Sequence, residues 1–139
     1  MNNKDIRNKI KRYKELKADI VDIDLRLQEL EEEMLGISAL TQGEKTSRTY
    51  KITSNVEEQA EKHLEKREEL LLLKSKKQRS ILRIDNALSI LDDEQKVIIE
   101  SILINKKRYC YLQDKLCLSY PRIKQLEATA MKQIEKYII

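Results

Sequence analysis

The sequence contains no tryptophan or phenylalanine, and its 139 residues include only 2 glycines and 1 proline. A chain with so few aromatic side chains is poorly suited to a large globular core, because aromatics supply much of the buried area in such cores. Few glycines and prolines also leave long stretches without a helix breaker. The abundance of Lys, Glu, Leu and Ile favours helix over sheet. We therefore expect an all-α protein built from extended helices.

Residues that commonly form metal or catalytic sites are also scarce. Cys110 and Cys117 are the only cysteines, and no third ligand lies near them, so we expect no zinc site and predict two buried, reduced thiols. His63, the only histidine, lies among glutamates and is predicted to be a solvated surface residue. We find no paired carboxylates, no nucleophile beside a base and no glycine-rich phosphate loop. The sequence gives no support for an enzyme or for a cofactor.

The sequence also shows no pattern typical of a membrane span or an export signal. The longest apolar stretch, residues 70–73, is far shorter than a membrane span. The first residues, MNNKDIRNKIKRYK, have no apolar signal core. We therefore expect a cytoplasmic protein with no membrane partner.

A heptad pattern occupies the first predicted helix, over residues 4–35. Steps of three and four residues separate its apolar positions, which is the pattern of a coiled-coil seam and requires a partner helix. We expect Gly36 to end this helix. The seam consists of Tyr13, Leu16, Ile20, Ile23, Leu27, Leu30 and Met34.

Residues 36–55 are rich in Ser, Thr and Gly, and they predict an exposed loop, with a short strand allowed at residues 48–53. Ser54 followed by Glu57 resembles a capping box, which predicts the start of a second helix over residues 56–91. The acidic residues 92–94 predict a break and a new helix start. Residues 1–91 would thus form two long helices for dimerisation or interaction, and residues 92–139 a separate domain.

Charge is unevenly distributed along the two long helices. Residues 4–17 hold seven basic and two acidic side chains, whereas residues 19–33 hold one basic and seven acidic. The order reverses in the second helix, with six acidic and three basic residues at 57–69 and five basic and none acidic at 74–83. A hairpin within one chain would place the two basic ends together, extending a DNA-facing surface. The alternative is antiparallel pairing between chains, in which opposite charges meet.

Residues 93–139 predict three or four short helices. Val97, Ile98, Ser101 and Ile102 share one face of the first, and Leu112 and Leu116 face inward in the second. Residues 117–119 form a tight turn before a last helix at 120–137. Helix, three-residue turn and helix is the geometry of a helix-turn-helix motif. The core positions of the last helix are Ile123, Leu126, Ala130, Met131 and Ile134.

The segment LSYPRIKQLEATAMKQIEKY resembles the recognition helix of region 4 of bacterial sigma factors. Two positions depart from that family: Cys117 replaces the usual turn glycine and must adopt a left-handed conformation, at a cost of about 1 kcal/mol. Gln113 replaces a small alanine. Tyr120 and Pro121 stand where the family reads bases with charged residues, so its promoter sequence does not carry over. The residues in register are Leu118, Ser119, Arg122, Ile123, Lys124, Gln125, Glu127, Ala130 and Ile134.

The whole layout resembles small phage and prophage late-gene regulators of the ArpU/RinA type. This resemblance implies a sequence-specific DNA-binding transcription regulator, and we expect an activator of phage-type late genes. Its expected partners are double-stranded DNA, a second copy of the chain in a homodimer, and RNA polymerase.

Position assigns roles to the residues that would contact DNA. Gln125 is the best candidate for a base edge, and Arg122 and Lys124 lie on exposed faces of the recognition helix. Tyr120 suits a sugar or a thymine methyl group. Residues 104–136 hold eight basic and three acidic side chains. The plainer alternative is that these are ordinary solvated charges on a helical domain. The remaining candidates are the phosphate-binding residues Lys106, Lys107, Arg108 and Lys115, together with Ser119.

Two other functions fit the same order of segments. A phage small terminase subunit also joins a helix-turn-helix motif to a coiled oligomerisation helix. A coiled-coil adaptor would use its C-terminal helices to bind RNA polymerase in place of DNA.

Overall fold

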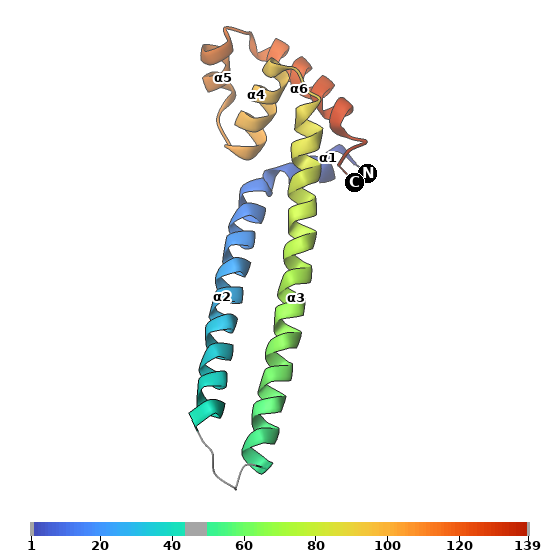
Figure 1. Cartoon of the computed structure of the whole chain (residues 1–139). Coiled ribbons are helices and arrows are strands. Elements are labelled where there is room, and N and C mark those ends of the chain that lie inside the picture. The colour runs from blue at the N-terminus through green and yellow to red at the C-terminus, as the bar shows by residue number, and fades with distance from the viewer. Residues whose placement is uncertain (1, 44–49, 139) are drawn as a thin grey trace. The chain divides into compact units, whose positions relative to one another are not determined.

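The computed structural model describes the backbone of residues 2–43 and 50–138, and the side chains of residues 2–36 and 55–138. Every regular element in these residues is a helix, which confirms the expected all-α class (Figure 1). The elements are α1 (Asn3–Lys11), α2 (Tyr13–Gly43), α3 (Tyr50–Ser89), α4 (Asp93–Ile99), the π-helix η1 (Glu100–Ile104), α5 (Tyr109–Leu116) and α6 (Tyr120–Ile134).

The chain divides into two compact units. One, here called the terminal unit, contains Met1–Lys17 and Gln78–Ile139, and the other, the paired-helix unit, contains Ala18–Lys77. The division crosses α2 and α3, whereas the sequence suggested a boundary between residues 91 and 92. The reason is that the first residues of the chain share a core with the last ones.

That shared core is apolar and fully buried at its centre. Ile6 and Ile10 of α1 are at most 1% exposed, and α1 packs against η1. A second cluster brings together Ile98, Leu112 and Ile123, with Leu116 and Leu126 partly buried against it, as the sequence predicted. The first cluster contains Ile6, Ile10, Ile84, Ala87, Leu88, Leu91, Ile99, Leu103, Ile104, Ala130, Met131, Ile134 and Ile138.

The predicted single helix over residues 4–35 is wrong at Arg12, where α1 ends and α2 follows. Arg12 has φ −85° and ψ 2°, and its N–H bonds to the carbonyl of Lys9. Ile6 and Ile10 enter the core of the terminal unit, while the heptad seam begins only at Tyr13. The first two seam residues, Tyr13 and Leu16, also pack against that core.

In the paired-helix unit, the predicted seam positions of α2 are the buried or half-buried ones, from Ile20 to Met34. Ion pairs join α2 to α3 and show that the two helices run antiparallel, side by side (Figure 1). Their register departs from the expected meeting of like charges: basic residues 74–77 of α3 meet acidic residues 19–24 of α2. The pairs are Lys74–Asp24 at 2.5 Å, Lys77–Asp19 at 2.7 Å and His63–Glu33 at 2.7 Å.

The predicted loop over residues 36–55 is wrong where the structure describes it. The helix α2 continues to Gly43, and α3 already begins at Tyr50, so residues 50–53 form no strand and Ser54 does not start the helix. Residues 44–49 lie outside the described part. A glycine in a helix costs about 1 kcal/mol relative to alanine, and Gly36 shows that this cost alone does not end a long helix.

The predicted helix start after residue 92 is confirmed: Asp92 is extended, and its N–H donates to Oε1 of Gln95. The helix α4 continues directly into η1, whose last turn closes with a bond from Asn105 N–H to the Glu100 carbonyl. The predicted apolar face missed three buried residues, because Ile98 and Ile99 join different clusters and the helix is covered on two sides. Those residues are Ile99, Leu103 and Ile104.

Candidate nucleic-acid interface

The connection between η1 and α5 carries three exposed cations, Lys106, Lys107 and Arg108. Lys106 adopts a positive φ of 54°, which is unusual for a residue with a side chain. The Lys107 N–H can then donate to the Ser101 carbonyl at 2.8 Å, which closes the end of η1. Arg108 is the N-cap residue of α5. The backbone thus fixes the positions from which these predicted phosphate-binding side chains project.

Tyr111 of α5 gathers two of the predicted cations. Its ring lies 5.5 Å from Nζ of Lys107 and 5.7 Å from Nζ of Lys115, and the residue is 43% exposed. Cations near an aromatic face are attracted by the ring quadrupole, which holds them close together. Tyr111 is not among the site residues predicted from the sequence. Its signal in the sequence was the four-residue spacing of Lys107, Tyr111 and Lys115, of which the last two lie on one face of α5.

The turn between α5 and α6 follows the predicted conformation. Cys117 has φ 55° and ψ 38°, so it occupies the left-handed region that glycine adopts most easily. Ser119 is extended and caps α6, and its carbonyl accepts the N–H of Ile123 at 3.0 Å. The prediction that Cys110 and Cys117 are buried is wrong, because both are exposed. Cys117 lies in the turn itself, and Cys110 lies outside both core clusters.

The first turns of α6 present the predicted recognition residues. Tyr120 begins the helix and is 46% exposed, and Pro121 is accommodated in the first turn. Arg122 and Gln125 are exposed, and their side chains approach each other only at 3.5 Å. Because no closer contact joins the two side chains, both are accessible on this face.

Lys124 differs from its neighbours because the protein already engages its ammonium group. Nζ donates to the Tyr109 hydroxyl at 2.9 Å and lies 4.4 Å from the centre of the Tyr109 ring. The hydrogen bond to Tyr109 raises the pKa of Lys124 above its ordinary value, and so do the charges of nearby groups. Tyr120 packs edge-on against Tyr109, with ring centres 5.3 Å apart. Lys124 therefore links the start of α6 to α5.

Glu127 is the main residue whose structural role was not predicted from the sequence. Its side chain is 1% exposed, yet it carries a carboxylate that pairs with Nη1 of Arg7. Tyr109 donates to its second oxygen at 2.8 Å, and Nζ of Lys124 lies 4.0 Å away. Its burial could have been predicted from the sequence, since Ile123, Glu127 and Ala130 follow the spacing of a buried helical face.

This buried carboxylate ties three helices of the terminal unit together. Arg7 belongs to α1, Tyr109 to α5 and Glu127 to α6. Burial raises the pKa of Tyr109, which therefore keeps its proton for donation to Glu127. A carboxylate without these donors would be costly to bury. The network thus fixes how the exposed start of α6 stands relative to α5.

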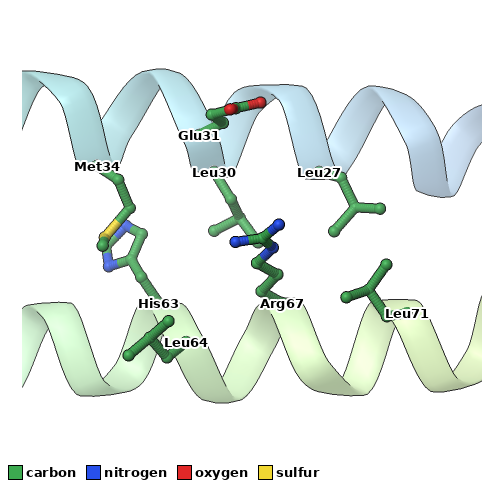
Figure 2. A pocket seen from close by; sticks show the side chains of 8 residues that line it. All are labelled: Leu27, Leu30, Glu31, Met34, His63, Leu64, Arg67 and Leu71. Carbon is green, nitrogen blue, oxygen red and sulfur yellow. The ribbon is translucent and has the colours of Figure 1, made fainter.

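A cavity lies between α2 and α3 in the paired-helix unit. Its volume is about 180 Å³, and in Figure 2 Leu27 and Leu71 point toward one another across it. His63 is not the solvated residue expected, because its side chain is only 15% exposed. Its two ring nitrogens lie 2.7 Å from the Gln59 carbonyl and 2.7 Å from a Glu33 carboxylate oxygen. The lining residues are Leu27, Leu30, Glu31, Met34, His63, Leu64, Arg67 and Leu71.

Within the described residues, no three His, Cys, Asp or Glu side chains are grouped so as to hold a metal ion. No helix in that part of the chain combines the length and apolar character needed to cross a membrane. Comparisons with protein-family models, with curated proteins and with solved structures found no match to the chain. Evidence for a function therefore comes from the residues themselves.

Proposed function

We propose that the chain is a sequence-specific DNA-binding transcription regulator in which α5 and α6 act as a helix-turn-helix motif. In this proposal α6 is the recognition helix, and the resemblance to ArpU/RinA-type regulators suggests activation of phage-type late genes. The long helices α2 and α3 would serve dimerisation or contact RNA polymerase.

The observation that carries the proposal is the junction between α5 and α6. Three residues separate the helices, and the first of them, Cys117, is left-handed. Helix-turn-helix motifs use such a turn to set the second helix against the major groove, where its N-terminal residues meet base edges. Arg122 and Gln125 are exposed in that part of α6. Arginine pairs well with guanine, and glutamine with adenine.

The charges around this junction support the same function. Lys107 and Lys115 flank the Tyr111 ring, and Lys106 and Arg108 are exposed in the preceding connection. Lysine and arginine contacts to phosphates position a protein on duplex DNA, while base contacts supply the specificity. The buried network of Arg7, Tyr109 and Glu127 gives α6 a fixed setting, which base reading requires.

The decisive experiment is selection of bound fragments from genomic DNA by the purified full chain, followed by binding measurements on the enriched duplex. We expect fragments that share one sequence, with an affinity that falls linearly with salt on logarithmic axes, by about 0.9 in slope per neutralised phosphate. Failure to enrich any sequence would overturn the proposed specificity.

A matched pair of variants sharpens the test. Arg122→Ala lies at the proposed base-reading end of α6, whereas Lys132→Ala removes an exposed cation from its last turn. We expect the first to weaken binding to the selected duplex far more than the second. Equal losses would indicate nonspecific attraction of the basic segment to DNA. Co-purification with RNA polymerase without any DNA binding would instead favour an adaptor.

A further inference from the structure

One exposed stripe of α3 has charges arranged in mirror order about a leucine. Leu72, which is 56% exposed, stands at the centre. Acidic residues lie four, seven and eleven positions before it, and basic residues lie four, seven and eleven positions after it. Offsets of four, seven and eleven keep residues within about 40° of Leu72 around a helix, so the seven side chains share one face about 80° wide. They are Glu61, Glu65, Glu68, Leu72, Lys76, Arg79 and Arg83, and all are exposed.

Each half of this stripe brings like charges together on its own helix. Glu61 and Glu65 are four residues apart, as are Arg79 and Arg83, and like charges at that spacing destabilise a helix. Interactions that these side chains make within their own chain leave the order of the charges unchanged. A partner surface with the same order of charges, running in the opposite direction, would place an acidic side chain beside every basic one.

The surface with that order of charges is the stripe itself, turned end to end. In an antiparallel pair of α3 helices, Leu72 meets Leu72 of the other copy, and Glu68 meets Lys76. A two-fold interface requires a self-complementary patch of this kind. Parallel pairing would instead place acid against acid and base against base.

We propose that α3 is a self-association surface, through which two copies of the chain pair antiparallel about Leu72. The contact buries the exposed Leu72 at the two-fold axis. The flanking acid–base pairs set the direction of pairing. None of these residues is among the proposed DNA-contacting residues of α6, and the inference does not depend on DNA binding.

Charge reversal on the full-length chain tests the pairing. Glu68→Lys alone and Lys76→Glu alone should each raise the dissociation constant of the dimer by about tenfold or more, because each sets like charges opposite one another. The two variants mixed together should form a heterodimer, and the double variant should recover the homodimer. Glu32→Lys, an exposed reversal on α2, is the control and should change nothing. Sedimentation velocity at low salt supplies the readout, and association should weaken between about 50 mM and about 500 mM salt.

Cysteine cross-linking tests the direction. In a chain carrying Cys110→Ser and Cys117→Ser, Leu72→Cys should give a covalent dimer with a short bis-maleimide reagent. Glu68→Cys alone should not, whereas Glu68→Cys mixed with Lys76→Cys should cross-link. A Glu68→Cys chain that links to itself would indicate parallel pairing and overturn the proposal. So would a monomer at every concentration, or a ring of many copies.

Discussion

The guanidinium of Arg7 pairs with the carboxylate of Glu127 across 120 positions of the sequence. The Glu127 side chain is almost completely buried, whereas that of Arg7 is 30% exposed. The contact joins α1 to α6 inside the terminal unit and makes the N-terminal helix part of the C-terminal core. It also supplies the first prediction.

Removing the partner of Glu127 should destabilise the terminal unit. Arg7→Ala leaves the buried carboxylate with the Tyr109 hydroxyl as its remaining close donor, and we expect a loss of about 1–3 kcal/mol in the free energy of unfolding. Urea unfolding followed by circular dichroism measures it. Arg12→Ala is the control, because Arg12 and Glu15 form an exposed pair whose loss should cost at most about 1 kcal/mol. Equal effects of the two substitutions would show that the Glu127 contact adds no special stability.

The left-handed backbone of Cys117 makes this position suitable for a stabilising substitution. Its left-handed backbone costs a residue with a side chain about 1 kcal/mol, which glycine avoids. We therefore expect Cys117→Gly to raise the free energy of unfolding by up to about 1 kcal/mol. Cys117→Ala is the matched control, since it removes the thiol but keeps Cβ, and it should bring no gain. Thermal unfolding of the three proteins distinguishes the outcomes, and an equal gain for alanine would locate the effect in the thiol.

The cations of α6 should contribute unequally to DNA affinity. Arg122→Ala, at the proposed base-reading end of α6, should relax one base preference and should also reduce the salt slope of binding by about 1, because it removes a cation from the interface. Lys124→Ala should weaken binding to all sequences with a smaller change in slope, because its ammonium already bonds to Tyr109. Gln125→Ala should relax the preference at one base position, with about 1–3 kcal/mol of discrimination lost. Fluorescence anisotropy over a salt series measures all three, and identical slopes for Arg122→Ala and Lys124→Ala would contradict the distinction.

His63 predicts a pH dependence of the paired-helix unit. Hydrogen bonds to the Gln59 carbonyl and then to the Glu33 carboxylate raise the pKa of His63 above its ordinary value of 6.5. A raised pKa in the folded state means that the protonated ring stabilises the fold. This contribution is complete below pH 6.5 and is lost as the pH rises through the folded pKa.

The test compares the chain with His63→Gln in thermal unfolding at several pH values. Below pH 6.5 the histidine protein should be more stable than the variant, and the difference should shrink as the pH rises above that value. Glu33→Gln should reduce the pH dependence, because it removes the second of the two partners. A difference that stays constant across this range would show that the ring contributes only by packing.

Some of this architecture could be predicted from the sequence because its causes are local. The heptad seam of α2 and the helix start after Asp92 each follow from residue spacing within a few residues, whereas the left-handed Cys117 was expected only from the resemblance of its turn to a known motif. The same local signals failed at Gly36 and at Ser54, where continuous helix overrode a weak breaker and an apparent cap. Local preferences are small, and packing along a long helix can exceed them.

The candidate interface was only partly readable for the same reason. The sequence placed Arg122 and Gln125 at positions that the structure leaves exposed, since helical spacing fixes which side of a helix a residue occupies. It could not assign Tyr109 to Lys124, or Tyr111 to two lysines at once. Those contacts depend on how helices cross.

The sequence by itself determined the all-α class, the apolar stripe of α2 and the order of charges along α3, because helical period and composition act over neighbouring residues. Only the tertiary structure decided that α1 joins the C-terminal core, that Glu127 is buried and that both cysteines are exposed. Burial depends on which surfaces meet across long separations, and Arg7 finds Glu127 only after the chain has folded.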